Sequence, residues 1–214
     1  MINVQLLQEY ITLIKDIITI ISTIAIGVVA IMGLRAWRIQ LRGKTEYELA
    51  RRLLRSVYKV RDAIKLVRNP FASAGEISSA LRDANIEISF GDPDYHARSQ
   101  GALYQSRWKH IQESLRDLDL EAFEAEVVWG REVIEIILPL RRQIGELYSH
   151  IEIYLKNLQE PSRREYALKM AQKIDEVIYD SHDLVGSDSK NSFTNKTVAA
   201  VKQIEDYIRP RLKL

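Results

Sequence analysis

The sequence predicts an all-α protein, in which a single N-terminal transmembrane helix precedes a cytoplasmic antiparallel helical bundle. Three observations lead to this fold class. An uncharged apolar run occupies residues 17–34, basic residues follow it directly, and the remaining chain repeats its apolar residues with helical spacing. We find no convincing strand pattern. A length of 214 residues suits one anchor and one domain.

The apolar run is long enough to cross a bilayer. Ile17–Leu34 contains 18 residues without a charge. As a helix they span about 27 Å, close to the hydrocarbon thickness of about 30 Å. We therefore expect a transmembrane helix over residues 10–34, after a short extracytoplasmic N-terminus of residues 1–9. The alternatives are a buried core helix and a cleaved signal peptide, but the first fourteen residues contain no basic residue.

The distribution of charge predicts the orientation. Residues 35–68 carry eleven Lys or Arg against three acids, a net of +8, whereas residues 69–214 carry a net of −5. Cytoplasmic flanks are enriched in Lys and Arg, so we expect an uncleaved signal-anchor in a bacterial inner membrane, with the C-terminal domain in the cytoplasm. The residues expected to contact lipid headgroups are Arg35, Trp37, Arg38, Arg42 and Lys44.

One face of the apolar helix differs from the rest of it. At 100° per residue, small and polar residues fall within one stripe about 140° wide. Lipid surrounds a lone helix uniformly, whereas a partner helix favours small residues and hydroxyls at the contact. The alternative is that the hydroxyls bond to carbonyls of their own helix. The expected packing or lumen stripe is Thr12, Lys15, Asp16, Thr19, Ser22, Thr23, Gly27, Ala30 and Gly33.

A basic juxtamembrane helix is expected to follow, within residues 35–68. Gly43 is expected to end the first helix, and Thr45 with Glu48 forms a capping-box pattern for the next one. This helix carries a basic patch, and we expect its partner to be acidic. Pairing with the acidic residues of 69–214 is favoured over binding to nucleic acid. The patch consists of Arg51, Arg52, Arg55, Lys59 and Arg61.

Residues 69–214 are expected to form the helical bundle. We expect a turn at 69–75, a short helix at 77–85, a loop at 89–94, a helix after Pro161, a loop at 185–196 and a last helix ending at Pro210. Asp119 is a candidate N-cap between two helices, and Pro139 is expected to kink the second. Apolar residues at alternating spacings of four and three form two seams. These are Tyr104, Trp108, Ile111, Leu115 and Leu118, then Val133, Ile137, Leu140, Ile144, Leu147, Ile151, Tyr154 and Leu158.

The sequence carries no recognisable catalytic motif and no expected cofactor or metal. Cysteine is absent, and phosphate-loop, dinucleotide, zinc-protease and serine-elbow patterns are missing. A helical ribonuclease of the HEPN type would use an arginine, four to six residues and then a histidine, but seven residues separate Arg142 from His150. Asp92, Asp94 and His96 are interpreted as a polar turn rather than a metal site. His182, with Asp183 and Asp188, is interpreted in the same way.

We therefore expect a non-enzymatic membrane oligomer, acting as a scaffold or a pore-like effector. The alternative functions are an anchored adaptor that binds a partner protein and, with less support, a degenerate HEPN-like nucleic-acid-binding protein or ribonuclease. The overall plan is similar to that of membrane accessory proteins of bacterial antiviral systems, some of which have degenerate HEPN-like folds. This similarity concerns architecture alone, because no motif is shared. The expected partners are the lipid bilayer and further copies of the chain.

Overall fold

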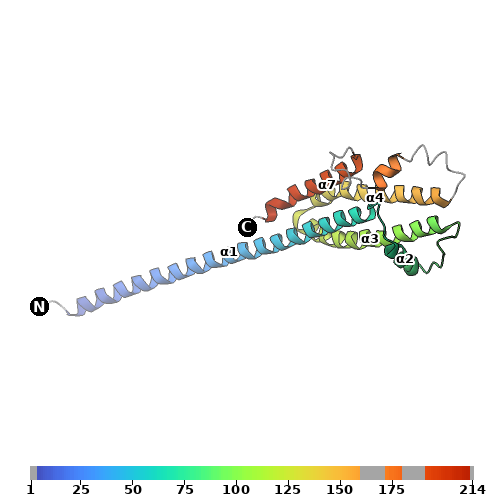
Figure 1. Cartoon of the computed structure of the whole chain (residues 1–214). Coiled ribbons are helices and arrows are strands. Elements are labelled where there is room, and N and C mark those ends of the chain that lie inside the picture. Colours follow the sequence, from blue (N-terminus) through green and yellow to red (C-terminus); the bar gives the residue numbers. More distant parts are fainter. Residues whose placement is uncertain (1–3, 160–171, 180–190, 213–214) are drawn as a thin grey trace. The chain divides into compact units, whose positions relative to one another are not determined.

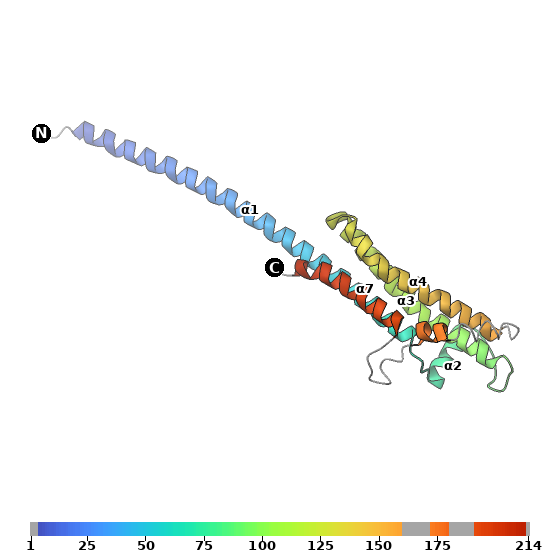
Figure 2. The ribbon, with the colours of Figure 1, turned by 90° about the horizontal axis from the view of Figure 1, so that it is seen from above.

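The computed structural model describes residues 4–159, 172–179 and 191–212, and every regular element among them is helical. The helices are α1 (Val4–Val67), α2 (Ala74–Asp83), α3 (Tyr95–Trp129), α4 (Glu132–Gln159), α7 (Ser192–Ile208) and the 3₁₀ helix η2 (Arg209–Leu212). Figures 1 and 2 show these elements. Residues 172–178 are helical as well. The all-α class predicted from the sequence is therefore confirmed for the described residues.

The chain divides into two compact units. The N-terminal unit is Met1–Glu46, and the C-terminal unit is Tyr47–Leu214. Among the described residues, α1 is the helix whose length and composition suffice to cross a membrane. All side chains described between residues 9 and 38 are exposed.

Helix α1 does not end at Gly43, so the expected break between two helices there is wrong. The Thr45 hydroxyl donates to the carbonyl of Leu41 at 3.0 Å, which is the bond of a threonine inside a helix rather than of an N-cap. A glycine ends a helix most readily when it adopts positive φ, and among the described glycines only Gly130 does so. Thr45 and Glu48 therefore have the sequence pattern of a capping box, but no helix begins at Thr45.

The C-terminal unit has one main apolar core. Helix α2 packs on α3, α3 on α4, and α4 on α7 (Figures 1 and 2). The inner face of α1 reaches this core through Leu49, Leu53, Val57, Val60, Ile64 and Val67. The second predicted seam is buried from its start through Val133, Ile137, Leu140, Ile144, Leu147 and Ile151. Burial of each such side chain stabilises the fold by about 1.5–3 kcal/mol.

Helix α3 is longer than the sequence predicts, and Asp119 is not an N-cap. The helix continues to Trp129, and the chain turns at Gly130, whose φ of 86° favours glycine. The Asp119 carboxylate instead pairs with Arg141 of α4 at 2.6 Å. The residues between Asp119 and Gly130 are mostly Leu, Ala and Glu, which favour helix strongly enough to carry it past the candidate cap.

The remaining elements agree in part with the sequence. Ser73 caps α2, which begins three residues earlier than expected, and α4 continues through Pro139. Helix α7 begins at Ser192, so residues 192–196 are helical rather than part of the expected loop. Within α7, Val198 is exposed, whereas Val201, Ile204 and Ile208 are buried. Pro161, the residues just after it and His182 lie outside the described residues.

Candidate functional site

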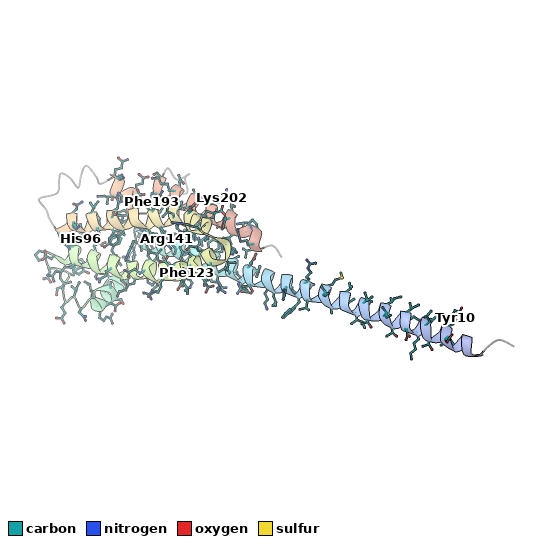
Figure 3. All side chains as sticks on the ribbon, turned by 180° about the vertical axis from the view of Figure 1, so that it is seen from behind. Tyr10, His96, Phe123, Arg141, Phe193 and Lys202 are labelled. Carbon is teal, nitrogen blue, oxygen red and sulfur yellow. The ribbon has the colours of Figure 1, made fainter. Side chains whose placement is uncertain are left out.

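The candidate stripe lies on the exposed N-terminal part of α1. Every residue of the stripe that the sequence predicts is exposed in the structure. The apolar side chains on the other faces, including Ile17, Ile24 and Ile31, are exposed by 48, 62 and 63%. The N-terminal unit thus presents a helix with a continuous apolar surface that nothing in the described chain covers. Figure 3 shows these side chains, with Tyr10 labelled near the start of the helix.

Two hydroxyls of the stripe, those of Thr19 and Thr23, form hydrogen bonds within the helix. The Thr19 hydroxyl donates to the Lys15 carbonyl, and the Thr23 hydroxyl donates to the Thr19 carbonyl, both at 2.8 Å. Such bonds to the carbonyls of the same helix are the alternative that the sequence analysis gave to contacts with a partner helix. The hydroxyls of Thr19 and Thr23 therefore do not need a partner helix, although each oxygen can still accept a bond from one.

The two glycines of the stripe, Gly27 and Gly33, are not explained by contacts with the described residues. Apart from its chain neighbours and the backbone of its own helix turn, a Cβ added at Gly27 or at Gly33 would meet no atom of the described residues within 4 Å. Neither glycine has a positive φ angle; among the described glycines, only Gly130 has one. Glycine inside a helix costs about 1 kcal/mol relative to alanine. Packing among the described residues therefore gives no reason for a glycine at either position.

The residues expected at the headgroups are exposed where they are described. Arg35, Trp37, Arg38 and Lys44 all belong to α1 in the N-terminal unit and are exposed. The side chain of Arg42 lies outside the described part. The structure thus leaves these basic and aromatic groups accessible.

The basic patch is partly engaged by acids of α3. Arg52 contacts Glu121 at 2.9 Å and also contacts Glu124, and Lys59 pairs with Asp117 at 2.7 Å. The Glu121 hydrogen bond raises the pKa of Arg52. These pairs are the internal contacts that the charge distribution favours. They also fix the register between α1 and α3.

The other patch residues make weaker or local contacts. Arg51 lies 3.9 Å from Glu48 of its own helix. Arg61 pairs with Asp62 at 2.8 Å and lies over the ring of Tyr58. Arg55 is exposed and forms no ion pair with any described residue. The five residues therefore do not form one free cationic surface.

Two buried arginines, which the sequence analysis did not single out, organise the C-terminal unit. Arg107 of α3 binds Glu76 of α2 through two bonds of 2.7 and 3.1 Å, and it donates to the carbonyls of Asn69 and Phe71. The Arg107 hydrogen bonds lower the pKa of Glu76. A signal was available, because Arg107 lies three residues after Tyr104 and four before Ile111, on the inner face of its helix.

Arg68 plays a similar part at the end of α1. Its guanidinium donates to the carbonyls of Val177, Glu176 and Tyr179 at 2.7, 3.0 and 3.1 Å, at the end of helical residues 172–178. It also donates to the Thr194 hydroxyl at 2.9 Å. The arginine thereby satisfies helix-terminal carbonyls and joins two segments to α1.

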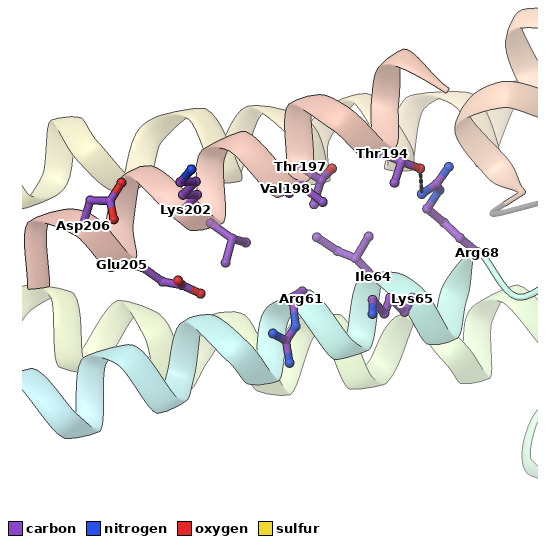
Figure 4. A pocket seen from close by; sticks show the side chains of 11 residues that line it. Arg61, Ile64, Lys65, Arg68, Thr194, Thr197, Val198, Lys202, Glu205 and Asp206 are labelled. Atoms are coloured by element: carbon purple, nitrogen blue, oxygen red, sulfur yellow. Dashed lines mark hydrogen bonds between the residues drawn. The ribbon is translucent and has the colours of Figure 1, made fainter. Parts of the chain in front are cut away.

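A groove of about 410 Å³ lies in the C-terminal unit between α1 and α7 (Figure 4). Ile64, Val198 and Val201 form its apolar part, and Lys65, Lys202 and Asp206 belong to its charged lining. Its volume is within the range of small-molecule sites. Its lining carries charges of both signs.

The two described histidine groups that the sequence raised, around His150 and His96, do not assemble into a site, and the group around His182 lies outside the described residues. The His150 ring bonds to the Glu146 carbonyl of its own helix at 2.8 Å, and Arg142 is exposed. Asp92 accepts from the backbone N–H of Ser89 at 2.8 Å, as in a polar turn. Among the described residues, no group of three or more His, Asp or Glu side chains is placed to hold a metal ion.

Comparison with protein families, curated proteins and solved structures finds no match to this chain.

Proposed function

We propose that this chain is a non-enzymatic single-pass membrane protein that assembles with copies of itself through its N-terminal helix and its helical C-terminal domain. The assembly acts as a scaffold or a pore-like effector. Bacterial antiviral defence is the cellular setting that we infer from its plan. The observation that carries the proposal is the exposure of the whole apolar stretch of α1. An apolar surface of this length is stable in a lipid bilayer and not in water.

The proposed orientation rests on the basic residues after the apolar stretch. Arg35, Arg38 and Lys44 are exposed and can reach headgroups, with Trp37 among them. Positive residues are retained on the cytoplasmic side, so the C-terminal unit is placed in the cytoplasm and the N-terminus outside. In a bacterium this membrane is the inner membrane.

The proposed arrangement of the C-terminal unit is an antiparallel bundle. Three contacts between α3 and α4 support it. The Tyr104 and Tyr154 ring centroids lie 5.8 Å apart, those of Trp108 and Tyr148 lie 5.1 Å apart, and Asp119 pairs with Arg141 at 2.6 Å. In these three pairs the residue number rises along α3 as it falls along α4, which is the pattern of antiparallel neighbours.

Self-assembly is proposed because of the glycines. Thr23 and Gly27 have the small-xxx-small spacing of close helix contacts in membranes, and no contact with the described residues requires a glycine at Gly27 or Gly33. With one span in each chain, a second copy is the simplest partner. Glycine then permits the two backbones to approach closely.

The copy number in detergent tests the proposal. We expect the full-length protein to give an oligomer by mass photometry, and Gly27→Leu to dissociate it, because the leucine fills the helix contact. Val28→Leu, on the opposite face, is the matched control and is expected to keep the oligomer. A monomeric wild type, or equal behaviour of the two variants, would reject assembly through this stripe.

The two alternatives have less support. An adaptor that takes a partner helix along its seam needs that seam exposed, whereas Ile137, Leu140 and Leu147 have no exposed surface. A degenerate HEPN-like nuclease needs Arg142 and His150 to converge, and His150 bonds within its own helix. Nucleic-acid binding is further weakened because Arg52 and Lys59 already contact carboxylates.

A further inference from the structure

The groove between α1 and α7 is bounded at both ends by hydrogen bonds between the two helices. At one end, the Arg68 guanidinium of α1 donates to the Thr194 hydroxyl of α7 at 2.9 Å. At the other end, Tyr58 of α1 bonds to Glu205 of α7, and burial together with this hydrogen bond raises the pKa of Tyr58. The helix between Tyr58 and Arg68 is about 15 Å long. The two helices are therefore held apart in a fixed geometry, as in a preformed ligand site.

The middle of the groove is apolar and open to solvent. Ile64 of α1 and Val201 of α7 belong to its lining and are almost fully buried. Val198, one turn before Val201, also lines the groove but is 61% exposed. Figure 4 shows Thr197 and Val198 pointing from α7 toward α1, and Ile64 pointing from α1 toward α7. An apolar group in the groove would remove this exposed surface from water, which is favourable.

The charges around the groove are unevenly distributed. Its lining contains four basic residues and two acidic ones, Glu205 and Asp206, which lie together at one end. The Arg209 guanidinium contacts Glu205 at 3.2 Å and compensates its charge. Lys65 lies toward the other end, one turn before Arg68, where it is exposed and forms no ion pair with any described residue. The Lys65 end of the groove is therefore the more positive one.

We propose that this groove binds a small amphipathic anion, a monocarboxylate with one apolar chain of medium length. Its carboxylate contacts Lys65, and its chain covers Val198 and Val201. Lys202, the other exposed lysine of the lining, is a poorer contact because Asp206 lies one turn later on the same helix and offsets its charge. All of these residues belong to the C-terminal unit, so the site does not depend on the proposed membrane location of α1.

Titration with octanoate tests the site. The full-length protein in phosphatidylcholine nanodiscs is titrated by isothermal calorimetry, and the signal of empty nanodiscs is subtracted. We expect saturable binding of one octanoate per chain. Octyltrimethylammonium and octanol carry the same chain with a positive charge or with none, and they are expected to bind about tenfold more weakly. Equal binding of the three compounds, or no saturable binding of octanoate, would overturn the proposal.

Two tryptophan variants show whether octanoate occupies this groove. Val198→Trp places a large side chain in the groove at an exposed position, so we expect the affinity for octanoate to fall by about tenfold or more. Ala199→Trp is the matched control, because Ala199 is the next residue of α7, is exposed and lies outside the lining. It is expected to bind octanoate like the wild type. Equal affinities of the two variants would place the bound octanoate elsewhere and overturn the proposal.

A lysine variant tests the contact with the carboxylate. Lys65→Gln is expected to weaken octanoate binding by about tenfold, because the ion pair is lost while the side chain keeps a similar size. Lys196→Gln, at an exposed lysine of α7 outside the lining, is expected to leave the affinity unchanged. Equal affinities of these two variants would overturn the role of Lys65.

The lipid composition of the nanodiscs distinguishes a free carboxylate from a membrane lipid. An anionic headgroup could also contact Lys65, but a groove about 15 Å long suits one short chain better than a phospholipid with two. We therefore expect the same affinity for octanoate in nanodiscs with and without phosphatidylglycerol. A weaker affinity in the presence of phosphatidylglycerol would show that the lipid competes for the groove, and this would overturn the assignment to a free monocarboxylate.

Discussion

Arg107 and Glu76 join α3 to α2 through a two-point ion pair, in which Nε lies 2.7 Å from one carboxylate oxygen and Nη2 lies 3.1 Å from the other. The arginine is 3% exposed. Its remaining donors bind the carbonyls of Asn69 and Phe71 in the connection between α1 and α2. One side chain thus holds three segments together, and this makes it sensitive to substitution.

Arg107→Ala is expected to destabilise the C-terminal unit by about 3–5 kcal/mol, because it leaves a carboxylate and two carbonyls without their donor. Chemical denaturation in detergent, followed by circular dichroism, measures this loss. Arg98→Ala is the control on the same helix. Arg98 is exposed, so its substitution is expected to change stability by no more than about 0.5 kcal/mol. Equal effects of the two substitutions would contradict the assigned role.

The same pair predicts a dependence of stability on pH. Arg107 lowers the pKa of Glu76 below its usual value near 4.5. A lowered pKa in the folded state contributes stability at neutral pH, and this contribution is lost as pH falls below 4.5 through the folded pKa. Denaturation of the wild type and of Glu76→Gln between pH 7 and pH 3 measures it. The stability difference between them is expected to shrink with falling pH, and a constant difference would refute the linkage.

The sequence predicted the fold class and the core better than the ends of the helices. Ile137, Leu140 and Ile144 repeat at a spacing that requires one buried face, and burial follows from that spacing. Gly43 and Asp119 are residue types that end or begin helices in some contexts, but neighbouring helix-forming residues continue the helix through both. Helix α3 ends before Gly130, which adopts a positive φ angle, and composition alone does not specify which glycine adopts such an angle.

The candidate surfaces were predictable to different extents. The stripe and the basic residues of α1 follow from periodicity and charge counts, because a helix fixes which residues share a face. The partners of Arg52 and Lys59 depend on the packing of α3 against α1, which joins residues far apart in sequence. The same applies to Arg68, whose acceptors are carbonyls at the end of helical residues 172–178.

Arg68→Lys is expected to destabilise the protein by about 3 kcal/mol, although it retains the charge. A lysine has no planar fork, so it cannot reach the carbonyls of Val177 and Tyr179 and the Thr194 hydroxyl together. Hydrogen exchange is expected to accelerate first in residues 172–179. Lys65→Arg, at an exposed position one turn earlier, is the matched control and should leave exchange unchanged. Unchanged protection in Arg68→Lys would show that charge alone suffices.

The pore-like version of the proposed function predicts an ion flux that depends on the stripe. In that version Thr19 and Thr23 face a water-filled lumen, where their oxygens can accept further hydrogen bonds even though both hydroxyls donate within the helix. Thr19→Leu combined with Thr23→Leu would create an apolar constriction, which gates by dewetting, and a loss of flux of about tenfold is expected. Ile17→Leu combined with Ile21→Leu has the same spacing on the opposite face and is expected to conduct like the wild type. Flux through liposomes, measured at equal copy number, distinguishes the lumen from a lipid-facing surface. If both double variants conduct equally, the stripe does not line a pore, and a scaffold is the better account of the oligomer.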